Sequence, residues 1–331
     1  MTLRLRHSAA VVLGAAVCMV PAWIAAQQPA AAPIPATLFP WAYPTSAPTP
    51  PAPPSTDPTI LHVPNSNKGF TRVQITDGFN PPDWHPEDHP PMPNIVAHGR
   101  APDIRACGLC HLPNGQGRPE NASLAGLPAA YIEAQVSDYR NGLRKSAEPN
   151  MGPPSSMLKL ALVTNEAEVK PAAEYFSKLK YKQWIRVVEA KVVPKTRVAT
   201  GMLIPLENTS EQIGQRIIEM PENVEVTELR DSQIGFIAYV PIGSVKRGEG
   251  LVTRLSPKTI QCKICHGEDL KGLGNVPFLA GRSPSYLVRQ MNDIKTGARQ
   301  GGYSPLMKSV VNNLQPEDMV AIAAYIASLK P

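Results

Sequence analysis

Cysteine is scarce in this sequence, because the 331 residues include only five. A strong excess of charge of one sign is also lacking: 33 lysines and arginines stand against 27 aspartates and glutamates, a net charge of +6. So small an imbalance is not typical of proteins that bind nucleic acid. The length is sufficient for two compact domains of ordinary size.

Residues 1–26 have the features of a secretory signal peptide: two arginines, an uncharged apolar run, then two alanines. We expect cleavage after this run and export to the periplasm, which removes both arginines and lowers the net charge to +4. Retention as a membrane tether would need nearly the whole run, which Pro21 interrupts. Lipidation of Cys18 is disfavoured because Val17 precedes it, where a small residue is usual. Four cysteines then remain in a compartment where thiols normally become bonded.

A proline-rich leader is predicted over residues 27–60. Eleven prolines lie between positions 29 and 58 in an almost uncharged background. Such a composition cannot bury a core, so we expect a disordered leader, serving as a tether or as no more than a mobile end. Residues 61–93 keep turn-forming Asn-Pro, Asp-Gly and Pro-Pro pairs. We expect an irregular segment there, packed on the first domain.

An internal repeat at an offset of 155 residues organises the rest of the chain. The aligned pairs include Cys107 and Cys262, Cys110 and Cys265, His111 and His266, Tyr131 and Tyr286, Gln135 and Gln290, and Arg144 and Arg299. The register then slips by five residues and resumes, with Met157 on Met307 and Tyr175 on Tyr325. Each copy begins and ends in a helical pattern. The sequence therefore predicts a mainly α protein with two tandem helical domains, over 94–181 and 244–331.

Residues 182–243, between the two copies, have a different character. The run 185–193 alternates partly between apolar and charged residues, and 235–240 is rich in β-branched and aromatic residues. A proline follows each stretch. We expect a small strand-containing connector here.

Each copy carries a Cys-x-x-Cys-His motif, Cys107 to His111 and Cys262 to His266. Two thiols at this spacing can add to the two vinyl groups of one porphyrin while the adjacent histidine binds the iron. A redox disulfide or a zinc site are the alternatives, but neither explains why a histidine follows both pairs, and no βαβ pattern surrounds them. Because the motifs use every mature cysteine, we predict two covalently bound haem c groups, each with an iron ion.

An electron-transferring haem needs a second strong axial ligand, and methionine sulfur raises its reduction potential. Met157 and Met307 occupy one aligned position near prolines, so we predict them as the distal ligands, with Met151 as a second candidate in the first copy. The remaining histidines are more typical of locally bonded or surface groups, although one of them could replace Met157: His62, His85, His89 and His98.

The combined pattern resembles the class I c-type cytochromes, especially their two-domain dihaem type. The resemblance rests on Cys-x-x-Cys-His, then Leu-Ala-Gly, Tyr-x-x-x-Gln, Gly-x-Arg, a methionine in a proline-bearing loop, and a closing helix with Ala-x-Tyr. It implies helical domains around each haem, His and Met ligation, and electron transfer between redox proteins. The sequence departs from the family in its connector, its leader, and Leu112, which stands where glycine is usual.

We therefore expect an electron carrier with no catalytic residues, which accepts electrons from a dehydrogenase and passes them to an oxidase or another cytochrome. Two alternatives remain. A dihaem peroxidase would need one iron with an open distal position, which two equivalent methionines disfavour. A cytochrome subunit of a periplasmic dehydrogenase complex would differ from a carrier only in how long it stays on its partner.

Overall fold

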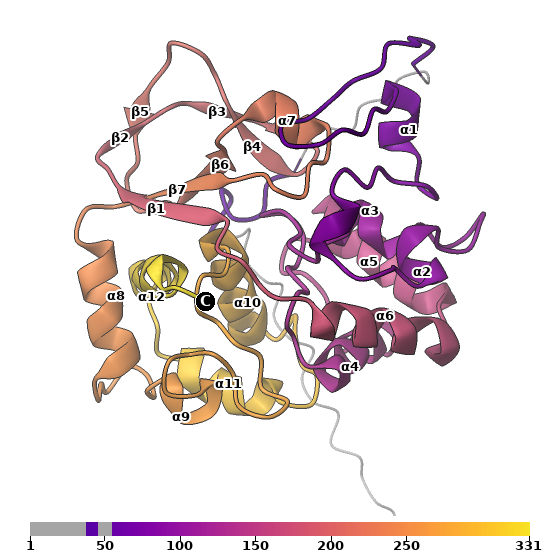
Figure 1. Ribbon diagram of the computed structural model, residues 1–331. Helices are drawn as coiled ribbons and strands as arrows, with labels where there is room; N and C mark the ends of the chain where they lie inside the picture. The colour runs from indigo at the N-terminus through magenta and orange to yellow at the C-terminus, as the bar shows by residue number, and fades with distance from the viewer. Residues whose placement is uncertain (1–37, 46–54) are drawn as a thin grey trace, which may run out of the picture. The chain divides into compact units, whose positions relative to one another are not determined.

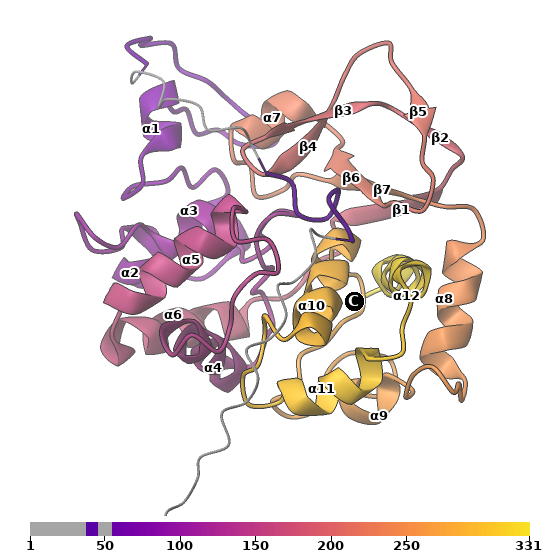
Figure 2. The same ribbon diagram turned by 180° about the vertical axis from the view of Figure 1, so that it is seen from behind.

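The computed structural model describes residues 38–45 and 55–331. The predicted signal peptide and much of the predicted leader therefore lie outside the described residues. The chain divides into two units, Met1–Pro33 and Ile34–Pro331, and every described residue belongs to the second. This unit is mainly helical with some strands, as the sequence predicts (Figures 1 and 2). Within the described part of the chain, no helix is long and apolar enough to cross a membrane.

Two similar series of helices occur, one in each copy of the repeat. The first contains α2 (Asn94–Ala97), α3 (Cys107–His111), α4 (Ala129–Arg140), α5 (Gly152–Val163) and α6 (Glu166–Lys178). The second contains α8 (Ser244–Thr253), α9 (Lys263–His266), α10 (Pro284–Thr296), α11 (Ser304–Val311) and α12 (Pro316–Ser328). In the first series α4 packs on α5 and α6, and in the second α10 packs on α11 and α12. The repeated sequence thus forms the same helix pairs twice.

The segment before the first series is short of regular structure. Over residues 55–93 it holds α1 (Arg72–Thr76) and a 3₁₀ turn, η1 (Pro86–Asp88). It contacts two parts of the chain. The Gly78 carbonyl accepts from Ala106 N, just before α3, at 2.9 Å, and Trp84 Nε1 donates to the Leu229 carbonyl, in the strand-containing region, at 2.8 Å. The segment therefore packs on the strand-containing region as well as on the first helical series.

All strands of the described residues lie between the two series. A three-stranded sheet has the order β1 (Ile185–Glu189), β7 (Phe236–Val240), β6 (Ile218–Pro221), with β1 parallel and β6 antiparallel to β7. Two hairpin-like pairs, β2 (Val192–Val193) with β5 (Glu211–Gln212) and β3 (Thr196–Ala199) with β4 (Met202–Pro205), and α7 (Val224–Glu228), complete the region. Phe236, Ala238 and Val240 are fully buried at alternate positions of β7, which fixes the face that the sheet presents to the core.

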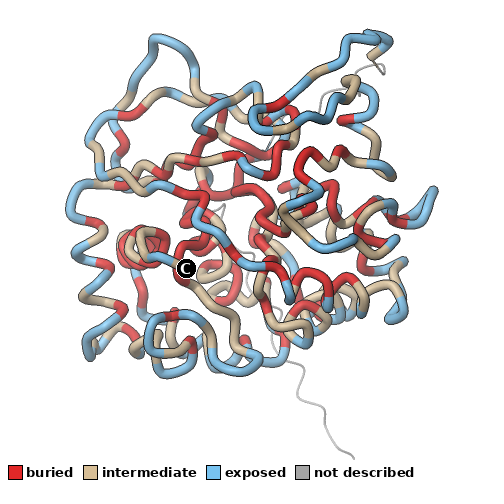
Figure 3. The backbone as a smooth tube through the Cα atoms, viewed as in Figure 1, coloured by how far each residue is buried: buried red, intermediate tan, exposed pale blue. Residues whose placement is uncertain are grey.

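Helices α8 and α12 cross closely, and Gly248 allows them to do so. A Cβ atom at position 248 would overlap the backbone carbonyl of Ala321 in α12. Small residues of α12, among them Ala323 and Ala324, are fully buried, and Figure 3 shows the burial along the backbone. The glycine therefore serves close packing rather than a turn.

Residues 38–45 of the leader are ordered and packed on the domain, which corrects the expectation of a disordered leader at these positions. Phe39 and Tyr43 are 2% exposed. The Tyr43 hydroxyl donates to Asp293 Oδ1 at 2.7 Å, and the same carboxylate oxygen accepts from Ala147 N at 2.9 Å. Aromatic residues supply enough apolar area to offset the ordering of a short segment, even where prolines surround them.

Asp318 links the start of α12 to the chain before the second Cys-x-x-Cys-His motif. Its carboxylate accepts hydrogen bonds from Gln315 N at 3.0 Å, from Lys258 Nζ at 2.9 Å, and from Arg247. Burial raises the pKa of Asp318, but the three donors outweigh burial, so its pKa lies below the usual value.

We expect Asp318→Asn to lower the free energy of unfolding by about 1–3 kcal/mol at neutral pH, because one hydrogen-bonded charge is lost opposite two cations. A depressed native pKa stabilises the fold above the unfolded pKa of about 4 and loses this effect as the pH falls through the native value. Denaturant titrations from pH 7 to pH 3 should show the two proteins converging below about pH 4. A constant difference across that range would contradict the assignment.

Candidate functional site

The two Cys-x-x-Cys-His motifs each form a short helical turn, α3 and α9, at the same place in the two helix series (Figure 1). Burial raises the pKa of the Cys107 thiol to about 12 and that of Cys262 to about 11. Reactive or metal-binding cysteines need the opposite, a depressed pKa that favours the thiolate. Burial therefore disfavours the thiolate at Cys107 and Cys262.

Each motif histidine is held by the same main-chain group. His111 Nδ1 lies 2.8 Å from the carbonyl oxygen of Ala122, and His266 Nδ1 lies 2.8 Å from that of Pro277, its repeat equivalent. A carbonyl can only accept, so Nδ1 carries the proton and Nε2 keeps its lone pair. Burial lowers the pKa of both imidazoles, which keeps them neutral. A neutral imidazole fixed through Nδ1 is the form that binds a haem iron.

The loops after the histidines repeat the same hydrogen bonds. Gly117 N donates to the His111 carbonyl at 2.8 Å, and Gly272 N donates to the His266 carbonyl at 2.7 Å. The residue that follows each histidine is in the left-handed region, with φ of 61° at Leu112 and 84° at Gly267. Leu112 therefore adopts the backbone that its glycine equivalent allows, at a cost of about 1–3 kcal/mol. The glycine missing from the sequence has not changed the geometry.

The candidate distal methionines lie on helices and not in the proline-bearing loops that the sequence suggested. Met157 is on α5 and Met307 is on α11, and both are half-buried. Met151 caps the start of α5 and is fully buried. The prolines lie within the first turn of each helix, where the missing N–H costs nothing. Two sulfurs thus remain candidates in the first copy and one in the second.

The other histidines are engaged locally. His85 Nε2 lies 2.9 Å from Asp231 Oδ1, His89 Nε2 lies 3.1 Å from Asp83, and His98 Nδ1 lies 2.9 Å from Asn80 Oδ1. His62 Nδ1 lies 2.8 Å from the Lys68 carbonyl. These contacts agree with the interpretation of all four as locally bonded groups.

A reciprocal network joins the two copies of the repeat, and the sequence analysis did not identify it. Arg144 binds Gln135 of its own copy at 2.9 Å and Tyr286 of the other at 3.1 Å. Arg299 repeats this with the equivalent residues, Gln290 at 3.0 Å and Tyr131 at 2.8 Å. The backbone beside each arginine forms an antiparallel bridge. Repeat-equivalent residues therefore exchange partners, and the alignment of all three pairs was the signal that could have revealed it.

Comparison with known proteins matches the second copy of the repeat to a protein family. The cytochrome c family model matches residues 245–330. Cytochrome c-554(548) of Halomonas halodenitrificans is 40% identical over 68 residues, which cover 20% of this chain and 82% of that protein. Cytochrome c4 of Azotobacter vinelandii is 38% identical over 81 residues, but the matched part spans only 39% of that protein and 22% of this chain.

A longer match covers more than two thirds of the chain. The thiosulfate dehydrogenase electron acceptor of Thiomonas intermedia is 26% identical over 232 residues, which cover 69% of this chain and 80% of that protein.

Proposed function

The chain belongs to the cytochrome c family of electron-transfer proteins, and we propose that it is an exported, periplasmic dihaem cytochrome that carries electrons between protein partners. The observation that carries this proposal is the duplicated histidine site. Two motifs hold their histidines through the equivalent carbonyls of Ala122 and Pro277, at the same 2.8 Å distance. A chain with two equivalent proximal sites has the apparatus for two haems.

Haem c supplies a one-electron couple at iron, and the residues of this chain determine how it is held. Cys107 and Cys110 would attach the first haem, and His111 and Met157 would supply its iron ligands, with Met151 as the alternative sulfur. Cys262, Cys265, His266 and Met307 would do the same for the second haem. Burial lowers the pKa of both imidazoles, which favours the neutral form that binds iron. Methionine sulfur would favour the ferrous state.

The domain division follows from this arrangement. Residues 94–181 and 244–331 are the two cytochrome domains, and 182–243 is the strand-containing connector, preceded by the segment 61–93. Residues 1–26 act as the export signal and are removed. The leader then starts the mature chain, with residues 38–45 docked on α10 through Tyr43.

The donor class is a dehydrogenase, and the acceptor is an oxidase or another cytochrome. The long match with a thiosulfate dehydrogenase electron acceptor favours a second form of the same proposal, in which this chain is the cytochrome subunit of a dehydrogenase complex. A peroxidase is disfavoured, because methionines at both aligned positions would leave neither iron an open distal position.

The test is the haem content of the protein purified from the periplasm. We expect two haems per chain by pyridine haemochrome assay, a far-red sulfur-to-iron absorption band from both sites, and ferrous haems that do not bind carbon monoxide. Replacement of both Cys262 and Cys265 by serine should reduce the covalent haem content to one per chain. A single haem in the unaltered protein, or binding of carbon monoxide at one site, would contradict the dihaem carrier.

A further inference from the structure

The strand-containing connector packs on the first Cys-x-x-Cys-His turn at two points. Arg230, which follows α7, donates from Nη1 to the carbonyl oxygen of Leu109 at 2.7 Å. Leu109 is the middle residue of α3 and is 5% exposed. At the second point Gly201, between β3 and β4, lies so close to Glu120 that a Cβ atom there would be 3.4 Å from the Glu120 side chain. The connector therefore brings the charge of Arg230 to the backbone of the first turn.

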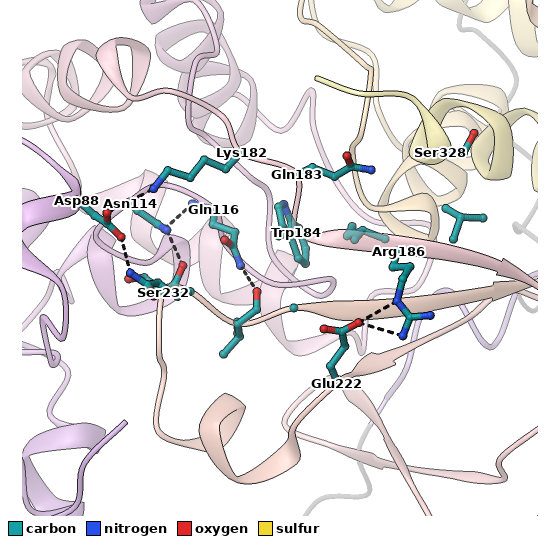
Figure 4. A pocket seen from close by; sticks show the side chains of 15 residues that line it. Asp88, Asn114, Gln116, Lys182, Gln183, Trp184, Arg186, Glu222, Ser232 and Ser328 are labelled. Atoms are coloured by element: carbon teal, nitrogen blue, oxygen red, sulfur yellow. Dashed lines mark hydrogen bonds and ion pairs between the residues drawn. The ribbon is translucent and has the colours of Figure 1, made fainter. Parts of the chain in front are cut away.

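The loop that carries Arg230 is also fastened to the chain that follows α3. Asn114 Nδ2 donates to the Ser232 carbonyl at 2.6 Å, and Gln116 Nε2 donates to the Ile234 carbonyl at 2.8 Å (Figure 4). With the bond from Arg230, three hydrogen bonds join this loop to the first motif and the residues after it. The position of the guanidinium group relative to the first motif is therefore well defined.

A buried ion pair lies in the loop that holds His111. Two contacts of 2.8 Å close this loop, one from Gly117 N to the His111 carbonyl and one between His111 Nδ1 and the Ala122 carbonyl. Arg118 and Glu120 lie between these points, with Nε and Oε1 2.9 Å apart, and are 6% and 4% exposed. Glu120 Oε2 is buried and has no hydrogen-bond partner among the described residues. Water screens charges buried in this way much less than it screens exposed ones.

The charges of Arg118, Glu120 and Arg230 sum to one positive charge beside the first motif. Burial and the neighbouring Arg118 lower the pKa of Arg230 to about 10, so Arg230 remains charged at neutral pH. Arg118 and Glu120 compensate each other as an ion pair. Arg230 forms no ion pair within residues 38–45 and 55–331, and its contact with Leu109 is to a neutral carbonyl. One cation is therefore left uncompensated at this site.

The second copy of the repeat has no counterpart of these three charges. The repeat equivalents of Arg118 and Glu120 are Leu273 and Asn275, which are uncharged. Arg230 belongs to the connector and lies outside the repeat. The loop that holds the second motif histidine therefore lacks the charges of the first.

The charged residues next to the second motif in sequence cancel. Lys263 is paired with Glu268 at 2.7 Å, and Asp269 and Lys271 are of opposite sign. The network of the two repeat arginines is reciprocal, so it contributes alike to both copies. The axial ligands proposed for the two haems are also of the same kind. The connector charge is thus the main electrostatic difference between the two sites.

We propose that Arg230 makes the first haem the stronger electron acceptor of the two, so that an electron on the second haem passes to the first. The inference rests on the proposed dihaem function. The step oxidises one ferrous iron to ferric at the second site and reduces one ferric iron to ferrous at the first, with no bond or proton changed. Ferric haem has one more positive charge than ferrous haem, so a nearby buried cation favours the ferrous state and raises the reduction potential. Glu120 acts in the opposite direction.

Variants of opposite sign test this assignment by spectroelectrochemical titration of the purified holoprotein. Arg230→Gln removes the positive charge, Arg230→Lys keeps it, and Glu120→Gln removes the negative charge. We expect two one-electron steps, of which Arg230→Gln lowers the higher potential and Glu120→Gln raises it. Each should change the equilibrium constant for transfer between the haems at least about threefold, in opposite directions. Arg230→Lys should stay closer to the unaltered protein than Arg230→Gln does, and the lower potential should not move.

Lys191→Gln is the matched control, because it removes the same charge from an exposed position of the connector. Lys191 directly precedes β2, which lies on the side of the connector away from α3 in both ribbon views (Figures 1 and 2). Water screens an exposed charge, so this variant should leave both potentials unchanged.

The proposal would be overturned by equal shifts of both potentials, by shifts of Arg230→Gln and Glu120→Gln in the same direction, by a shift of the lower potential alone, or by no shift beyond that of Lys191→Gln. Haem content by pyridine haemochrome assay separates this inference from the proposed function. One haem per chain in the unaltered protein would refute the proposed function and the inference with it. Two haems whose potentials the variants do not move would refute the inference alone.

Discussion

Replacement of Met307 by leucine should open the second haem to carbon monoxide and lower its reduction potential. Leucine removes the sulfur ligand but keeps a side chain of similar volume on α11. The iron then becomes five-coordinate, the far-red band falls to half its intensity, and the potential drops by on the order of a few tenths of a volt, within the roughly 0.8 V range that axial ligands span. A spectroelectrochemical titration with and without carbon monoxide measures all three changes.

Met291→Leu is the matched control for this experiment, because Met291 lies on α10 in the same domain and packs against the same core. It should leave the potential and the carbon monoxide response unchanged. The same readout distinguishes the two sulfurs of the first domain: Met157→Leu should open the first haem, and Met151→Leu should not. If Met291→Leu reproduced the effect of Met307→Leu, the spectrum would be reporting the packing of the domain and not its ligand.

The candidate attachment residues can be proposed from sequence because their chemistry depends on residues close in sequence. Two cysteines and a histidine within five positions define the attachment turn, and the repeat at offset 155 shows that the chain contains it twice. The histidine carbonyl partners could not be predicted, because Ala122 and Pro277 contribute only backbone atoms. A carbonyl carries no side-chain signal, so only the loop geometry identifies it.

The helices were predictable for a similar reason, and their contacts with one another were not. Periodic apolar residues predict α12, but they do not show that its partner is α8 or that Gly248 lies against Ala321. Arg144 and Arg299 align in the repeat, but the sequence does not show that their partners are Tyr286 and Tyr131 of the other copy. The cover of Leu109 by Arg230 joins residues more than a hundred positions apart. Single-sequence patterns report the environment of one element and not the identity of its neighbour.

The docked leader shows a different limit. The high proline content of residues 27–60 led to the expectation of disorder. The mean composition of this window does not show that three aromatic residues, Phe39, Trp41 and Tyr43, lie close together within it. Two of these three aromatic residues are buried to 2% exposure, and Arg289 Nη1 donates to the Ala42 carbonyl at 2.7 Å. Composition over a window describes the mean residue, whereas docking depends on a few side chains.

Two glycines of α8 should respond to alanine in opposite directions. A Cβ at Gly248 would overlap the Ala321 carbonyl, whereas a Cβ at Gly250 meets nothing within 4 Å. We expect Gly248→Ala to lower the free energy of unfolding by about 3 kcal/mol, the upper part of the range for overpacked cores, because backbone must move to admit the methyl group. Gly250→Ala should raise it by about 0.5–1 kcal/mol, since alanine lowers the entropy of the unfolded chain and favours the helix.

Denaturant unfolding of both holoproteins, followed through the haem absorption, measures the pair under identical conditions. The two variants also test how the candidate ligand Met307 is held, because α12 directly follows the helix that carries it. If the crossing of α8 and α12 holds α11 in place, Gly248→Ala should weaken the far-red sulfur band at denaturant concentrations well below the unfolding midpoint. Gly250→Ala should let the band persist to higher denaturant concentrations than in the unaltered protein. A destabilised variant whose band persisted up to global unfolding would instead show that the ligand is held by the packing of α11 on α10 alone.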